Sequence, residues 1–260
     1  MVLEVCCSSV DDALEAEAGG ADRVELCSSL FFGGLTPSHG TIVEAVRRLR
    51  IPAIVMVRPR GGGFCYTDVE FATMVTDAQA AVEQHAAGIV FGVLTPTGEV
   101  DVPRTRTLRQ IAGSRDAVFH RAFDVTPDPF RALDQLVDLG ITRVLTSGQQ
   151  PSVAEGLELI CRLIEYGGDR IQVMPGGGIR PHNFTEVISR TQCRHIHVAA
   201  FTTREDDSTR HHPAVTFGGA LYPPENRYDL TDRDVIQRLS TARADFARSK
   251  TAGSLGDARR

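Results

Sequence analysis

The chain has 260 residues, of which 42% are hydrophobic, and this length is common for one domain of alternating strands and helices. The net charge is −5 and no long basic stripe occurs, which argues against a nucleic-acid partner. No apolar run approaches the ~20 residues that span a bilayer, and no secretory signal pattern precedes the first apolar run, so we expect a cytoplasmic protein without membrane contact.

Two residue types restrict the chemistry. The six cysteines form no CxxC pair and no zinc-type spacing, so we expect free thiols that serve packing, catalysis or a soft metal. Lys250 is the only lysine and lies in a polar tail. A Schiff-base enzyme needs a desolvated lysine, and the sequence therefore excludes the lysine-dependent aldolases.

Short apolar runs alternate with amphipathic segments of helical length along the whole chain. The expected strands are 2–6, 23–27, 53–58, 88–94, 117–123, 143–147, 171–175 and 195–200. Examples of the expected helices are 10–18, 40–49, 70–84, 129–139 and 153–164. Eight such units in series predict an α/β protein with the (β/α)8 TIM barrel fold. The alternative, an open doubly wound sheet, is weakened because no GxGxxG follows the first run.

The barrel is expected to be a single domain over residues 1–246. The segment 202–228 follows the eighth strand and is predicted to form a loop on the C-terminal face of the barrel. Residues 247–260 are rich in glycine, serine and charge, and we expect them to form a disordered tail.

The first two strands carry the same Glu-x-Cys pattern, in LEVC and VELC. Side chains alternate across a strand, and the apolar neighbours should face the helices. Glu4, Cys6, Glu25 and Cys27 should then point into the barrel, with the thiols at the C-terminal strand ends, where barrel active sites lie. Neighbouring strands lie about 4.8 Å apart, so the two thiols are expected to meet.

The same alternation adds polar residues to this interior. The candidate catalytic residues are Glu4, Glu25, Arg58, His120, Arg121, Asp124 and His197. Buried carboxylates need cationic partners, and Arg58, Arg121 and His197 are the available ones. Either a structural ion network or an active site fits this set. Glycine-rich turns after the sixth and seventh strands further predict anion binding at Ser147, Gly148, Gly176, Gly177 and Gly178.

Many motifs in this order resemble the CutC family over roughly residues 2–200. They include LEVC, GGADRVELC, GGLTPS, RPRGG, FCYT, FHRAFD, RVLTSG and MPGGG. The resemblance implies a (β/α)8 barrel, a cytosolic location, a homodimer or higher homo-oligomer, and a proposed role in copper homeostasis. It also implies that Cys6 and Cys27 bind copper(I), which suits soft thiolate ligands. The family's His-x-Ser-Ala-Arg after the eighth strand is absent, because residues 197–201 read HVAAF.

Three functions remain open at this point. The first is copper(I) binding through Cys6 and Cys27. The second is an enzyme of isomerase, epimerase or lyase type that moves a proton on a small anionic or phosphorylated metabolite, without an organic cofactor. The third, weaker hypothesis makes His195 and His197 ligands of a hydrolase metal, because residues two apart share a strand face.

Overall fold

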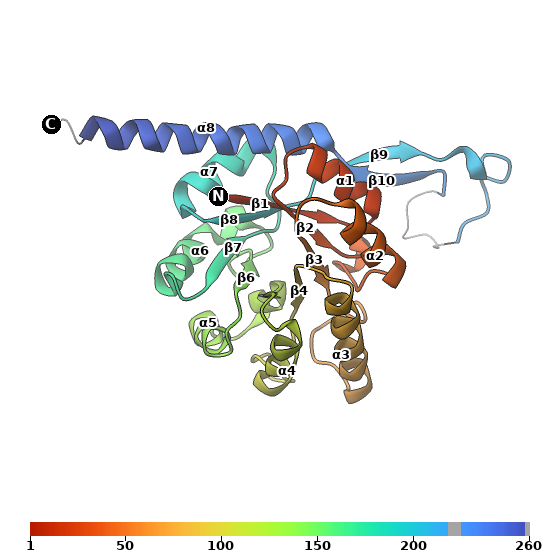
Figure 1. The fold of residues 1–260 in the computed structure, drawn as a ribbon, viewed down its shortest axis with the longest axis horizontal. Coiled ribbons are helices and arrows are strands. Elements are labelled where there is room, and N and C mark those ends of the chain that lie inside the picture. The colour runs from red at the N-terminus through yellow and green to blue at the C-terminus, as the bar shows by residue number, and fades with distance from the viewer. Residues whose placement is uncertain (218–224, 258–260) are drawn as a thin grey trace.

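A computed structural model describes residues 1–217 and 225–257 of the chain. Its centre is a sheet of eight parallel strands in the order β7-β6-β5-β4-β3-β2-β1-β8 (Figure 1). The strands are β1 (Val2–Cys7), β2 (Arg23–Leu26), β3 (Ala53–Met56), β4 (Gly88–Phe91), β5 (Asp116–Phe119), β6 (Arg143–Thr146), β7 (Gln172–Pro175) and β8 (His195–Val198). The edge strands β7 and β8 lie in contact. The sheet is thus a nearly closed barrel, which confirms the predicted TIM barrel fold.

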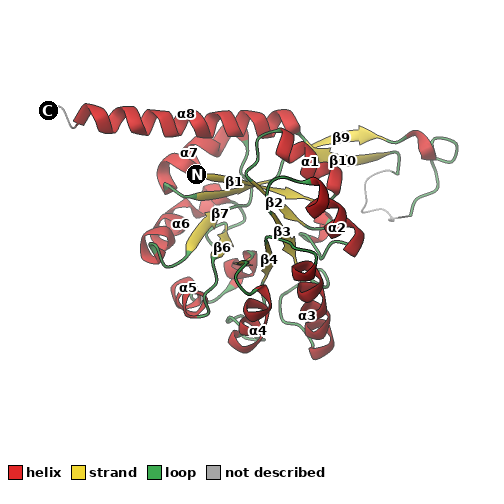
Figure 2. Ribbon diagram, in the orientation of Figure 1, coloured by secondary structure: helices red, strands yellow, loops and turns green. Residues whose placement is uncertain are grey.

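Helices connect successive strands on the outside of the barrel (Figure 2). They are α1 (Val10–Ala18), α2 (His39–Arg48), α3 (Asp68–Glu83), α4 (Val102–Ala112), α5 (Pro129–Asp138), α6 (Val153–Gly167) and α7 (Pro181–Thr191). Side chains of the residues just before several of these helices fix where the helices begin. Ser9 and Ser38 each accept a backbone N–H, and Thr67 forms a reciprocal capping pair with Glu70.

Strand alternation divides the buried residues as expected. Leu3, Val5 and Cys7 pack in a cluster with helix residues outside the barrel. Cys6 and Cys27 instead belong to an interior cluster with Ile54, Met56, Val90 and Val118. Because residues of one parity share one side of a strand, Glu4 and Glu25 also lie on the interior side. The predicted inward direction of the two Glu-x-Cys patterns is therefore confirmed.

The segments that follow β5 and β8 differ from the prediction. β5 ends at Phe119, and Arg121–Val125 form a short 3-10 helix, so the polar run HRAFD is not part of the strand. The segment 202–228 was predicted to be a loop, but β9 (Phe201–Glu205) and β10 (Arg227–Thr231) form an antiparallel hairpin. Because most residues of these two strands are polar and exposed, the hairpin does not have to pack against another layer of structure. It projects away from the barrel (Figure 1). Part of that predicted loop, residues 218–224, lies outside the described residues.

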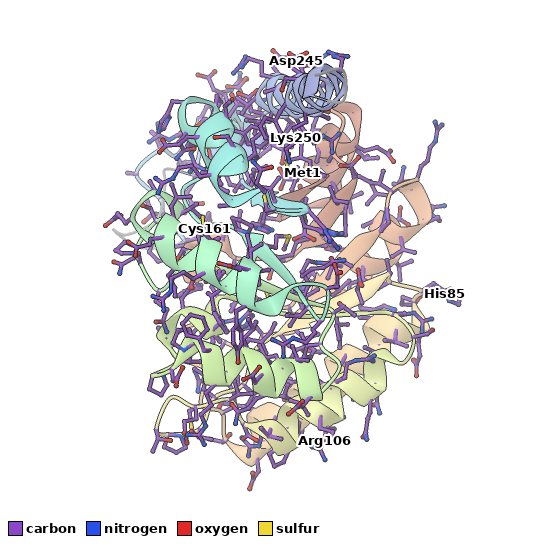
Figure 3. The ribbon with its side chains drawn as sticks, turned by 90° about the vertical axis from the view of Figure 1, so that its left-hand side faces the viewer. Met1, His85, Arg106, Cys161, Asp245 and Lys250 are labelled. Atoms are coloured by element: carbon purple, nitrogen blue, oxygen red, sulfur yellow. The ribbon has the colours of Figure 1, made fainter. Side chains whose placement is uncertain are left out.

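The last helix, α8 (Arg233–Asp257), lies across α1 and α7 on the outside of the barrel (Figure 1). Ile236 and Leu239 anchor it by packing into the outer core. The helix continues through residues 247–257, where we expected a disordered tail, and residues 258–260 lie outside the described part. Figure 3 shows Lys250 on this helix, on the exterior of the molecule. None of the described helices is long and apolar enough to cross a bilayer.

Candidate metal and ligand site at the barrel mouth

A cavity of about 460 Å³ opens at the carboxyl ends of the barrel strands. Cys6, Glu25 and His197 line one part of it, from β1, β2 and β8. Arg58 and His120, which follow β3 and β5, line another part. The cavity therefore gathers residues from strands that are far apart in sequence, at the end of the barrel where the fold places active sites.

The two predicted thiols meet at the wall of this cavity, which Cys6 lines. The Sγ atoms of Cys6 and Cys27 lie 3.8 Å apart, and both side chains are buried. The Cys27 Sγ also lies 3.4 Å from the carbonyl oxygen of Cys7. Hydrogen bonding with Cys27, together with burial, holds the pKa of Cys6 well above its usual range. Without a bound cation, Cys6 is therefore a neutral thiol.

Cys6 also belongs to a cluster that could hold a metal ion. Ligand atoms of Cys6, Glu25 and His197 all lie within 4.8 Å of one another. His197 donates from Nδ1 to the Glu4 carboxylate over 2.8 Å, and the same ring interacts with Cys6. This carboxylate–histidine arrangement is the usual way in which proteins orient a histidine toward a metal. Burial opposes the charge on His197, but Glu25, Cys6 and Glu4 outweigh it and raise its pKa.

The two interior carboxyl groups have opposite titration behaviour. Burial raises the pKa of Glu25 to about 7, and the charge of Glu4 acts in the same direction. Burial also acts on Glu4, but the hydrogen bond from His197 and the charge of Arg23 hold its pKa well below the usual range. Glu4 is therefore a fixed anion, whereas Glu25 is poised to exchange a proton near neutral pH.

Glu4 pairs with two cations: His197, as predicted, and Arg23, which the sequence analysis missed. The Nε of buried Arg23 donates to Glu4 over 2.5 Å. We expected Arg58 and Arg121 to neutralise the interior carboxylates, and this expectation is wrong, because both bind other groups. The signal for Arg23 was present in the sequence, since Arg23, Glu25 and Cys27 share one strand parity.

Arg58 instead supports the loops around the cavity. Its guanidinium donates to the carbonyl oxygens of Phe32, Gly34 and Gly62 over 2.6, 3.0 and 2.8 Å. It also lies over the ring of Phe64, 5.1 Å from the ring centre. Arg58 is only 6% exposed, yet it forms no ion pair within the described part of the chain. A buried positive charge thus faces the site without a negative partner.

His120 contributes a neutral ring to the same wall. Its Nδ1 accepts the backbone N–H of Ala122 over 3.1 Å, so the proton of the neutral ring resides on Nε2. That buried nitrogen has no partner among the described residues. Burial, aided by the charge of Arg58, lowers the pKa of His120 to about 3. Gly92 makes room for the ring, because a Cβ there would lie 2.5 Å from it.

Asp124 and Arg121 also line the cavity, but they bind one another. The Asp124 carboxylate accepts Arg121 Nε over 2.8 Å, and it accepts further hydrogen bonds from Thr146, Ser147 and Gln149. A carboxylate with this many donors is a structural anchor for the loop after β6. Its charge is already balanced by Arg121.

Of the five residues predicted to bind an anion, only Gly177 and Gly178 line the cavity. Ser147 is fully buried and hydrogen-bonds Asp124, and the N–H of Gly148 binds Thr146. Gly176 donates to the Thr146 carbonyl, and a Cβ there would lie 2.4 Å from Leu145. These three residues therefore pack the β6 and β7 ends together.

Arg180 is a second cavity residue that the sequence analysis missed. It follows Gly178 just before α7, is exposed, and lines the mouth of the cavity. Its Nη1 donates to the carbonyl oxygens of Ile179 and Ala199, each over 2.9 Å. These bonds hold the guanidinium between the β7 loop and the segment after β8. The described residues offer it no carboxylate partner.

Comparisons with known proteins support one family. The family model described as the CutC family matches residues 1–202. A CutC family protein of Treponema denticola is 46% identical over 91% of this chain and 96% of its own length. The human copper homeostasis protein cutC homolog is 42% identical over 92% of this chain and 88% of its own length.

Solved structures agree with this assignment. The crystal structure of a protein named copper homeostasis protein CutC, from Streptococcus agalactiae, has a TM-score of 0.73 and 37% identity, and covers 76% of this chain and 97% of its own. Phosphoribosylanthranilate isomerase from Thermotoga maritima, at 14% identity and TM-score 0.54, covers 93% of this chain and 98% of its own and shares the fold alone. The chain belongs to the CutC family.

Proposed function

We propose that this protein binds copper(I) through Cys6 and Cys27 and takes part in copper homeostasis. The main observation is the 3.8 Å separation of the two buried Sγ atoms inside the barrel mouth. Metal–thiolate bonds are about 2.3 Å long, so one ion can contact two sulfur atoms at this separation after small side-chain movements. Soft thiolates select copper(I) over the harder divalent ions. The names of the relatives support the same role.

The surroundings of the thiols favour a bound cation. Binding of copper(I) to both thiolates would release two protons, so one positive charge would replace two beside Glu25 and His197. His197 is close enough to Cys6 to become a third ligand, and Glu4 would then orient it. Because the thiols are buried, this arrangement fits a fixed site better than an exposed transfer site.

An anaerobic copper(I) titration against a competing chelator tests the proposal. Cys6→Ser and Cys27→Ser are each expected to weaken the affinity by more than the ~10- to 100-fold that loss of an outer-shell group costs. Cys65→Ser is the matched control, because it removes an exposed thiol from a loop and should leave the affinity unchanged. Thermal unfolding of each variant checks that it is folded. Equal affinity in all four proteins would exclude this site.

A second candidate function is proton transfer on a small anionic metabolite. The observation in its favour is the size of the cavity, because about 460 Å³ is in the range of small-molecule sites and far exceeds the space that one ion needs. Glu25 is the candidate base. The candidate acid is His197, which lies beside Glu25, or His120, which lies on another part of the wall.

A thermal-shift screen with mixed metabolites tests this candidate on the wild type, Glu25→Gln and Arg58→Ala. We expect a stabilising anion whose conversion requires Glu25. A ligand at about 100 times its Kd stabilises by about 2.7 kcal/mol. If no anion stabilises the wild type, this candidate fails. The cytoplasmic location and the homo-oligomeric state remain predictions.

A further inference from the structure

We propose that the cavity contains a specific site for a small oxyanion, a phosphate or a carboxylate, bound by Arg58, His120 and Arg180. This site is separate from the thiol pair. It names the ligand class of the second candidate function, but it does not depend on any reaction. The proposal rests on three side chains that line one cavity: among the described residues, Arg58 and Arg180 lack a carboxylate partner and His120 Nε2 lacks an acceptor.

The first donor is the guanidinium of Arg58. Burying a charge is costly unless the charge is paired. The three carbonyl oxygens that accept from Arg58 satisfy hydrogen bonds, but they do not neutralise its charge. Of the two acidic residues that line the cavity, Asp124 is already paired with Arg121, and Glu25 lies in the group with Cys6 and His197. An anion in the cavity would provide the missing negative charge.

The second donor is Nε2–H of His120. The backbone N–H of Ala122 occupies Nδ1, and this bond fixes the tautomer that carries its proton on Nε2. An unpaired buried donor is costly, and a ligand that accepts a hydrogen bond removes this cost. His120 lies near Arg58 around the ring of Phe64, which is 5.0 Å from the His120 ring centre. Both side chains line the same cavity as that ring, which is why the proposal assigns them to one oxyanion.

The third donor is Arg180 at the mouth of the cavity. It adds a second cation without a carboxylate partner in the described chain, and its two backbone bonds hold it in place. Next to it lie Gly177 and Gly178, and α7 begins at Pro181, so the positive end of the helix dipole lies at the same corner. An anion that enters the cavity would thus meet positive charge at the mouth and farther inside.

The distribution of charge gives the ligand an orientation. Glu25, Cys6 and His197 form a separate group in the same cavity. An oxyanion bound to the arginine wall would place the rest of a small ligand toward this group. Inorganic phosphate and malonate are therefore suitable probes, since each carries the recognised group without needing the remaining ligand.

The test measures phosphate and malonate binding by calorimetry, with potassium chloride at equal ionic strength as reference. The wild type should bind at least one of the two saturably, and Arg180→Ala should weaken that binding about 10-fold or more, because hydrogen bonds to charged groups are strong. Arg190→Ala is the matched control: Arg190 lies on α7, is exposed and pairs with Glu186. This control loses the same charge but should retain the affinity.

His120→Asn sharpens the test. The Asn oxygen can accept the Ala122 N–H in place of Nδ1, whereas the Nε2–H donor is lost, so the fold is preserved and binding should still weaken. Absence of saturable binding to both anions in the wild type, or equal losses in Arg180→Ala and Arg190→Ala, would overturn the proposal. Cys27→Ser should lose copper but keep the anion, and Glu25→Gln should lose turnover but keep the anion. These two variants separate the proposal from both functions above.

Discussion

The barrel interior has two charged regions that differ in how their charges are balanced. The lower region consists of Glu4, Arg23 and His197. The Glu4 carboxylate lies between the two cations, so each of these three charges has a partner. The upper region consists of Arg58 and His120. Within the described residues, Arg58 has no negative partner and the Nε2–H of His120 has no acceptor. Both regions are buried, so burial alone does not separate them.

The difference indicates which region serves folding and which serves a ligand. Charges that neutralise one another are complete without any other molecule, and removing one member leaves a costly buried charge. Unbalanced groups in a cavity cost stability and are retained where they do chemistry or binding. Variants in the two regions should therefore fail in different ways.

The largest effect is expected from breaking the balanced region. Arg23→Met removes the 2.5 Å bond to Glu4 and leaves the carboxylate with His197 as its partner. We expect a loss of about 3–5 kcal/mol in the free energy of unfolding, measured with urea. Arg47→Ala breaks the exposed pair with Glu44 and should cost no more than about 0.5 kcal/mol. Similar losses in both variants would contradict the comparison.

A smaller, pH-dependent effect is expected from the upper region. The pKa of His120 is about 3 in the folded protein, against an ordinary value of 6.5. Between pH 6.5 and pH 3, His120 is protonated in the unfolded chain but neutral in the folded protein. The stability that the neutral ring contributes is therefore present above pH 6.5 and is lost as the pH falls. Between pH 7 and pH 4 the wild type should lose about 3 kcal/mol more than His120→Asn. Parallel stability curves for the two proteins would refute this.

The smallest effect on stability is expected at the mouth. Arg180 is exposed and unpaired by carboxylates in the described chain, so Arg180→Ala should change the free energy of unfolding by about 0.5 kcal/mol or less. The same variant is the one expected to weaken phosphate or malonate binding. A loss of stability comparable to that of Arg23→Met would instead assign Arg180 to the framework of the barrel.

The sequence alone was sufficient to predict the barrel fold and the thiol pair of the site. Short apolar runs that alternate with amphipathic segments predict the strand–helix repeats. The alternation of side chains along β1 and β2 predicts that Cys6 and Cys27 both point into the barrel. Parity is a local property, so it cannot say which charges pair across strands. That limit explains why the role of Arg23 was missed and why Arg58 was assigned to the wrong partners.

The regions that follow strands were harder to predict. The run after β5 contains apolar residues that suit a strand, but His120 accepts the N–H of Ala122 and turns the chain into a 3-10 helix. The family's arginine after the eighth strand is absent, because Phe201 stands in its place. Only the fold shows that Arg180, from the preceding loop, reaches the Ala199 carbonyl and supplies a cation at this corner.

The isolated position of Lys250 on the exterior of α8 has a practical consequence for labelling (Figure 3). Apart from the N-terminal amine, this side chain is the only primary amine in the protein. An amine-reactive dye or surface linker would therefore attach the protein by its periphery and leave the barrel mouth open to solutes.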